Sequence, residues 1–89
     1  MVVFSIELTP GRAMRVLPRN PKRAAYTVFN PSPHTIYLGH DQNVTDAGPS
    51  MGIQIIPGAA YEDEFHKGEV WLYCASAAVV TVEEALKEE

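Results

Sequence analysis

The side chains of this sequence best suited to chemistry are three histidines and a group of carboxylates. His34, His40 and His66 are accompanied by Asp41 and Asp46. Imidazole and carboxylate groups bind zinc and other transition metals, so a small jelly-roll metalloenzyme is one hypothesis. The chain has no paired His-x-His element, however, and each histidine falls at a predicted strand end or turn. We therefore expect surface or turn histidines and no metal, and keep the metalloenzyme as an alternative.

A second group of possible ligands lies in the polar segment 41–48. Asp41, Asn43 and Asp46 offer oxygen atoms, which calcium prefers. The spacing lacks the alternating ligand run and the distal glutamate of an EF-hand loop. Aspartate and asparagine also form turns by binding their own backbone. The sequence therefore predicts a turn here rather than a cation site.

The remaining candidates for catalysis are also explained by structure. Glu62 and Glu64 should share one face of a strand while Asp63 takes the other, which is typical of a charged sheet edge. Cys74 lies in an apolar run, and we expect it to be a small buried residue rather than a nucleophile. No nucleophile and base occur together, and there is no Gly-rich phosphate loop. We expect a protein that is not an enzyme and has no cofactor.

Basic residues gather in one stretch of the chain. Five of the seven lysine and arginine residues lie between positions 12 and 23: Arg12, Arg15, Arg19, Lys22 and Arg23. A formal net charge of −4 disfavours binding to nucleic acid, and the stretch lacks interleaved aromatic residues for stacking on bases. Solvated charge is one interpretation. The functional alternative is a contact surface for an acidic protein partner, made by these five residues together with the N-terminal strand.

The elements that must position these residues are short strands. Alternating apolar positions and turn residues predict strands at residues 2–8, 12–17, 24–29, 34–38, 53–56, 60–65, 70–74 and 78–82. We expect the strands at 24–29 and 34–38 to pair as a hairpin. Strands spaced this closely, without helices between them, predict an all-β fold: a compact antiparallel β-sandwich or small jelly-roll-like barrel of about seven to eight strands.

The domain organisation follows from the length. A chain of 89 residues forms one domain, predicted at residues 1–82, followed by an acidic tail at 83–89 that favours a short, frayed helix. So small a domain buries only roughly 60–65% of its unfolded surface, so self-association would stabilise it. The start lacks the basic region of a signal peptide, and no segment has the apolar length of a membrane span. We expect no membrane association.

The aromatic residues allow two interpretations. Trp71 lies in the strongest predicted strand, and we expect it to pack in the core. Alternatively, Trp71 and Tyr73 lie exposed on one strand face, with Tyr37 or Tyr61 nearby, and form a platform for a glycan.

Several motifs together resemble one protein family. Residues 15–23 contain an Asn-Pro-Lys-Arg element, Tyr26–Asn30 follows as a strand ending in Asn, and Asn43-Val-Thr45 leads to the Gly-Ile-Gln-Ile-Ile-Pro-Gly turn at 52–58. This order resembles a family of small virion proteins of tailed bacteriophages and prophages. The resemblance covers roughly residues 12–82, so the N-terminal strand and the acidic tail lie outside it.

The resemblance implies a β-sandwich module on a virus particle, assembled in the host cytoplasm. The expected function is that of a non-enzymatic virion structural protein, above all a capsid decoration (cement) protein that docks on the phage head and stabilises it. The alternative is a tail or head-fibre module that binds a host glycan or receptor. The expected partners are further copies of the chain, for instance in a trimer at a three-fold position, and the major capsid protein or another virion protein.

Overall fold

Strand β1 (Val2–Leu8) shows how the sequence pattern becomes a two-layer fold. In this computed structural model, which describes residues 2–86, Phe4, Ile6 and Leu8 turn toward the core and the residues between them face solvent. The other elements are β2 (Met14–Leu17), β3 (Arg23–Phe29), β4 (Ile36–Gly39), the short 3-10 helix η1 (Gly48–Ser50), β5 (Ile53–Ile55), β6 (Ala60–Asp63), β7 (Val70–Tyr73) and β8 (Ala78–Leu86). The predicted all-β fold is confirmed.

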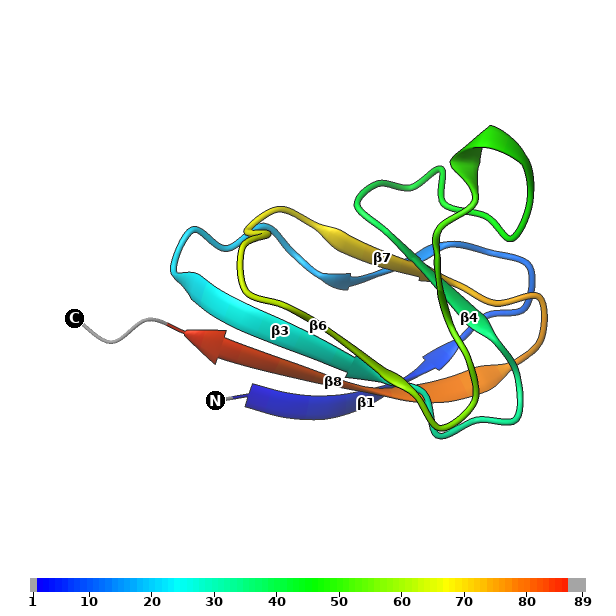
Figure 1. Cartoon of the computed structure of the whole chain (residues 1–89), viewed down its shortest axis with the longest axis horizontal. Helices are drawn as coiled ribbons and strands as arrows, with labels where there is room; N and C mark the ends of the chain where they lie inside the picture. Colours follow the sequence, from blue (N-terminus) through cyan, green and yellow to red (C-terminus); the bar gives the residue numbers. More distant parts are fainter. Residues whose placement is uncertain (1, 87–89) are drawn as a thin grey trace.

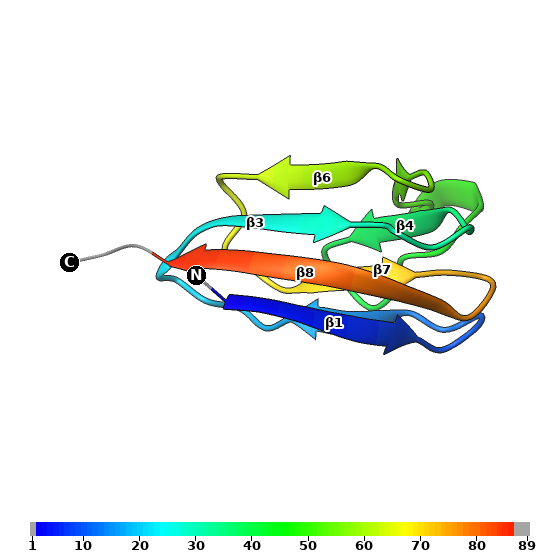
Figure 2. The same ribbon diagram turned by 90° about the horizontal axis from the view of Figure 1, so that it is seen from below.

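Two four-stranded sheets pack face to face (Figure 1). The first, called sheet A, has the strand order β1-β8-β3-β6, which can be followed in Figure 2. The second, called sheet B, has the order β2-β7-β4-β5. All these strand pairs are antiparallel. The architecture is therefore the predicted antiparallel sandwich.

The core lies between the sheets and is built from alternate positions of both. Val28, Val80 and Val82 of sheet A face Ile36 and Leu72 of sheet B, and all five are fully buried. Branched aliphatic side chains pack well on a pleated surface, which is why these runs form strands. Cys74 is buried in the same cluster and is reduced, which confirms its predicted role as a small core residue.

The predicted hairpin of residues 24–29 with 34–38 is wrong. β3 pairs with β6 and β8, whereas β4 pairs with β5 and β7 in the other sheet. The connection crosses between the layers around the buried Asn30, whose Nδ2 donates to the carbonyls of His34 and Ile55 at 2.7 and 2.8 Å. Its Oδ1 accepts from the hydroxyl of Ser32 at 2.6 Å. These bonds fix a crossing where a hairpin was expected.

The helix expected in the acidic tail is not formed where the tail is described. β8 continues to Leu86, flanked by β1 on one side and β3 on the other. Two neighbouring strands satisfy its backbone groups, and a helix of a few residues is marginal without tertiary support. Residues 87–89 lie outside the described part of the chain. The β domain thus extends beyond the predicted boundary at residue 82.

Smaller differences occur at strand ends. The strand predicted at 60–65 stops at Asp63, because its Oδ1 accepts the backbone N–H groups of Phe65 and His66 at 2.7 and 3.0 Å. The strand predicted at 12–17 begins only at Met14, after the turn at Gly11, whose φ is 70°. A side-chain oxygen that binds nearby backbone donors ends a strand by offering an alternative to the ladder.

Candidate functional site: an aromatic surface beside a basic flank

The outer face of sheet B carries three aromatic rings. Alternation along β7 turns Val70 and Leu72 into the core, so Trp71 and Tyr73 project outward. Tyr37 of β4 is paired directly with Tyr73, so their side chains share this face. We call Trp71, Tyr73 and Tyr37 the aromatic surface. All three rings are half-buried.

The Trp71 ring is held in place by its neighbours. Its Nε1–H donates to Oε1 of Glu69 at 3.2 Å, and the other oxygen of Glu69 accepts from Nη1 of Arg15 at 3.0 Å. Arg15 is also the residue opposite Trp71 on β2. The hydrogen bonds from Arg15 and Trp71 lower the pKa of Glu69 below its usual value. The hydrogen bond to Glu69 therefore restrains the orientation of the indole.

Two depressions border Trp71. One, of about 490 Å³, has Trp71 and Tyr73 on one side and the polar residues Arg12, Gln42 and Asn43 on the other. The second, of about 270 Å³, lies between Trp71 and the segment from Thr9 to Arg15. Rigid aromatic rings beside hydrogen-bonding side chains can stack on the apolar face of a sugar and bind its hydroxyl groups.

The position of Trp71 corrects the prediction that it packs in the core, and the tyrosine that shares its face is Tyr37, not Tyr61. Trp71 was expected in the core, but it is absent from the core cluster because Val70 and Leu72 occupy the inward positions of β7. Of the two tyrosines proposed to flank it, Tyr37 lies on the same face. Tyr61 belongs to sheet A, with its ring centroid 6.3 Å from that of the core residue Tyr26.

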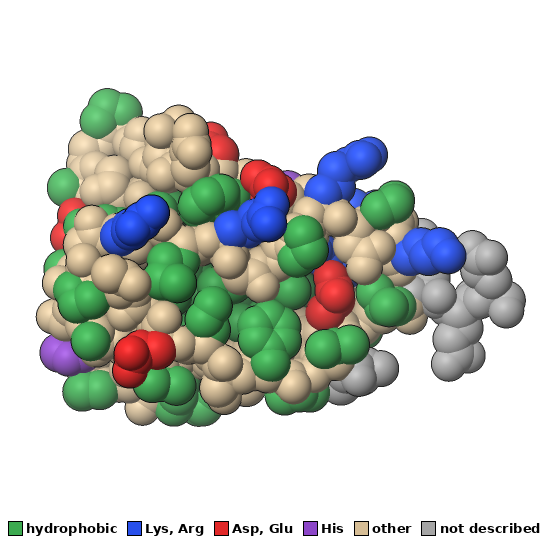
Figure 3. Space-filling model, turned by 180° about the vertical axis from the view of Figure 1, so that it is seen from behind, with side chains coloured by type: hydrophobic (Ala, Val, Ile, Leu, Met, Phe, Trp, Pro, Cys, Tyr) green, Lys and Arg blue, Asp and Glu red, His purple; other side chains and the backbone are tan. Residues whose placement is uncertain are grey.

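Next to the aromatic surface lies a set of exposed cations. Arg12, Arg15, Arg19 and Lys22 are all exposed on β2 and the loops beside it. We call these four residues the basic flank. Figure 3 shows lysine and arginine side chains in a row across one face of the molecule, above a group of hydrophobic side chains. Of the four, Arg15 forms an ion pair with Glu69 in which both side chains remain largely exposed.

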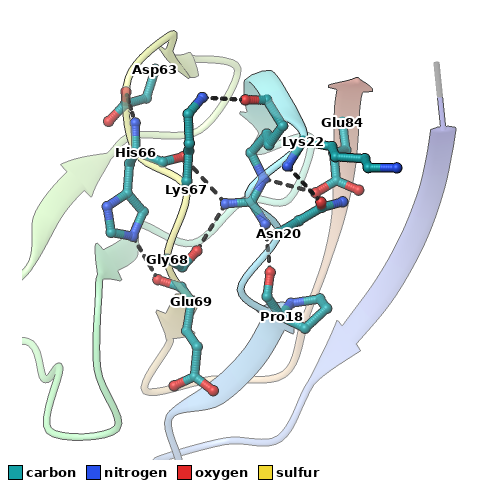
Figure 4. Close-up of polar contacts among 10 residues, drawn as sticks. Pro18, Asn20, Lys22, Asp63, His66, Lys67, Gly68, Glu69 and Glu84 are labelled. Carbon is teal, nitrogen blue, oxygen red and sulfur yellow. Dashed lines mark hydrogen bonds and ion pairs between the residues drawn. The ribbon is translucent and has the colours of Figure 1, made fainter. Parts of the chain in front are cut away.

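Arg23 departs from the predicted contact surface. Its side chain is fully buried, and its Nε donates to Oε2 of Glu84 at 2.7 Å. Nη2 donates to the carbonyl of Pro18 at 2.6 Å, and Nη1 to that of Gly68 at 2.8 Å. Pro18, Gly68 and Glu84 converge on this guanidinium from three segments of the chain (Figure 4). A side chain enclosed in this way is not offered to a partner.

The surroundings of Arg23 explain why the sequence did not reveal its role. The backbone carbonyl of Arg23 accepts from Nζ of Lys67 at 2.6 Å, and the N–H of Asn20 donates to the carbonyl of Lys67 at 2.8 Å. These contacts join the β2–β3 loop and the start of β3 to the turn before β7, 44 or more residues later in the chain. The local signal was limited to the position of Arg23 at the start of an apolar strand.

The three histidines do not come together. The rings of His40 and His66 are stacked at 3.6 Å with an interplanar angle of 12°. Partial burial and the neighbouring His66 lower the pKa of His40. His34 lies in the β3–β4 loop, where its carbonyl accepts from Asn30. Within residues 2–86, no three His, Cys, Asp or Glu side chains form a group that could hold a metal ion.

The polar loop at 41–48 is held in place by a hydrogen bond between a side chain and its own backbone and by the packing of one buried residue. Oδ1 of Asp41 accepts the N–H of Asn43 at 2.8 Å, which is the turn predicted from the sequence. The buried Val44 then packs against Gly39 and Gly52. A Cβ atom on Gly52 would lie 2.5 Å from the carbonyl oxygen of Leu38, so only glycine fits there. The loop therefore closes over β4 and forms one wall of the larger depression.

Comparisons with known proteins give no relative for this arrangement. In the described part of the chain, no helix has the length and apolar character needed to cross a membrane. No family model, no curated protein and no solved structure matches the chain.

Proposed function

We propose that this protein is a non-enzymatic structural component of a virus particle, a decoration protein that docks on the head of a tailed bacteriophage. The observation that carries this proposal is the basic flank. Arg12, Arg15, Arg19 and Lys22 are exposed together, whereas the outer face of sheet A carries the acidic residues Glu7, Glu62 and Glu83. Positive and negative charges therefore lie on different sides of the molecule, and the positive side is suited to contact an acidic capsid shell.

The physical chemistry of docking supports a basic contact surface. Complementary charge accelerates encounter and fixes orientation, while like charge keeps the acidic face of sheet A away from the shell. A small sandwich also gains stability by burying apolar surface against a partner. The resemblance to small bacteriophage virion proteins supplies the identity of that partner, the major capsid protein.

Purified protein added to bare heads, assembled from the major capsid protein of the encoding phage or prophage, tests the proposal. We expect binding that weakens as salt rises, because at 0.1 M salt the attraction between exposed charges more than about 10 Å apart is already largely screened. A variant with Arg12→Gln, Arg19→Gln and Lys22→Gln should lose binding. Arg15 is left unchanged because it positions Trp71.

The matched control neutralises three exposed acidic residues instead: Glu7→Gln, Glu62→Gln and Glu64→Gln. It should bind as the unaltered protein does. Equal losses in the two variants, or heads that gain neither protein nor resistance to heat, would rule out docking through the basic flank.

A second function is favoured by the position of Trp71. We propose, as the alternative, a tail or head-fibre module in which the aromatic surface binds a host glycan. Binding of neutral oligosaccharides, followed by the fluorescence of Trp71, tests this. Trp71→Ala should abolish binding and Trp71→Phe should retain part of it. An indole that acrylamide cannot quench would contradict an accessible platform.

A further inference from the structure

The four edges of the two sheets differ in how they are protected. An edge strand exposes unpaired N–H and C=O groups, and proteins block such edges with charges, prolines, bulges or short strands. β6 is four residues long and carries Glu62 and Asp63. β2 has a register shift between Arg15 and Leu17 and is followed by Pro18, and β5 has three residues before Ile56 and Pro57. Each of these three edges is blocked by at least one such device.

Strand β1 is the longest of the four edge strands, and the only such device within it is a single charge. It is seven residues long, contains no proline or lysine, and pairs with β8 from Val2 to Leu8 without a register shift. Its one charged residue is Glu7. Figure 2 shows β1 lying at the border of sheet A, with β8 on its inner side. A long, regular edge of this kind is a template for another strand.

The side chains of β1 also remain incompletely covered. Phe4 and Ile6 face the core but are half-buried, and Val3 is 56% exposed on the outer face. A strand added beside β1 would cover Phe4 and Ile6 on the inner face and Val3 on the outer face. The apolar gain would accompany new backbone hydrogen bonds.

We propose that β1 pairs with β1 of a second copy in antiparallel register centred on Ser5, which joins two sheets A into one continuous sheet. Residues directly opposite must share a face, so the two position numbers must add to an even number. A sum of ten gives full overlap: Ser5 faces Ser5, Phe4 faces Ile6, Val3 faces Glu7 and Val2 faces Leu8. No like charges are opposed in this register.

A two-fold axis is the symmetry expected for such a contact, because the same strand is used by both copies. The inference rests on the proposed structural role and deepens it by naming a second copy as a partner. It also replaces the trimer expected from the sequence with a dimer, since an edge paired with its own copy closes at two.

Sedimentation equilibrium of single-position variants tests the pairing. Wild type should reach about 20 kDa, twice the 9.8 kDa of one chain. Ser5→Lys places two ammonium groups opposite each other across the axis and should give a folded monomer. Thr81→Lys is the matched control, because Thr81 is the partner of Ser5 on β8 and faces the same way. The two lysines at position 81 would be about 14 Å apart, three strand spacings, so this variant should remain a dimer.

The register itself is tested by a charge cycle between positions 3 and 7. Val3→Lys places a lysine opposite Glu7 of the second copy and should tighten the dimer several-fold. Val3→Lys with Glu7→Lys opposes lysine to lysine and should weaken it roughly ten-fold relative to Val3→Lys alone. Glu7→Lys alone faces valine and should change little. Within one chain, positions 3 and 7 are about 13 Å apart along the strand, so their direct interaction is largely screened.

The outcomes separate this inference from the proposed function. A monomeric or trimeric wild type, or equal masses for Ser5→Lys and Thr81→Lys, overturns β1 pairing. A cycle in which Val3→Lys and the double variant associate equally overturns the register. A protein that dimerises as predicted but leaves bare heads undecorated overturns docking alone, whereas a monomer that decorates heads overturns the pairing alone.

Discussion

Replacing Arg23 by alanine should remove a large part of the stability of this domain. The guanidinium is fully buried and binds Glu84 and the carbonyls of Pro18 and Gly68. Its loss leaves a carboxylate that is only 12% exposed without its cation, and several carbonyls without donors. Breaking a buried ion pair costs about 3–5 kcal/mol. A chain of 89 residues has a free energy of unfolding of about 4–13 kcal/mol, so this change removes at least about a quarter of it and, at the low end of that range, all of it.

Urea unfolding followed by circular dichroism measures the effect. With an m value of about 1.5 kcal/mol/M, a loss of about 4 kcal/mol lowers the midpoint by about 2.7 M. Arg15→Ala is the matched control, because its ion pair with Glu69 has the same charge types but side chains that are 52% and 40% exposed. An exposed pair of this kind is worth about 0–1 kcal/mol. Equal midpoint shifts for the two variants would mean that burial does not decide how much an ion pair contributes to stability.

Three further predictions concern single residues. The pKa of His40 is lowered from 6.5, chiefly by partial burial and by His66, so the unfolded chain binds more protons than the folded chain. Stability should therefore be full above about pH 6.5 and fall as the pH drops toward the folded pKa. Thermal unfolding of His40→Gln, measured over the same pH range, should not show this decline. Gly52→Ala should cost about 1–3 kcal/mol in chemical unfolding, because the new Cβ would lie 2.5 Å from the Leu38 carbonyl oxygen; an unchanged midpoint would refute that close approach. Tyr26→Phe should leave the free energy of unfolding unchanged or raise it by up to about 1 kcal/mol, because the buried hydroxyl has no partner among the described residues and burial raises its pKa. A decrease of more than about 1 kcal/mol would reveal a hydrogen bond made by that hydroxyl.

The strands were predictable because their alternation is local. β1, β7 and β8 show apolar residues at alternate positions. Turn residues mark the ends of strands, as Pro57 and Gly58 do between β5 and β6. Gly58 has a φ of 81°, a backbone conformation that glycine adopts at little cost. Local pattern therefore gave the all-β sandwich and most of its elements.

The sequence predicted one pair of neighbouring strands, residues 24–29 with 34–38, and that pair is wrong. The strand starting at Ile36 follows β3 closely, yet the buried Asn30 carries the chain to the other sheet. Likewise, β8 continues to Leu86 because β1 and β3 flank it, and the residues near the tail do not indicate that pairing. Contacts between distant segments decide both cases.

The candidate site was only partly predictable for the same reason. Arg12, Arg15, Arg19 and Lys22 are exposed, as a contact surface requires, and their role in binding stays a prediction. The burial of Arg23 depends on Glu84, 61 residues away, and could not be inferred from its neighbours. The outward position of Trp71 could have been inferred, since Val70 and Leu72 are the better inward residues of an alternating strand.

The most direct test of the proposed function is electron cryo-microscopy of bare phage heads incubated with saturating protein. Docking through the basic flank predicts added density at defined positions of the capsid lattice, with the basic flank toward the shell and the outer face of sheet A away from it. Heads that show no added density, or density in which sheet A lies against the shell, would contradict it.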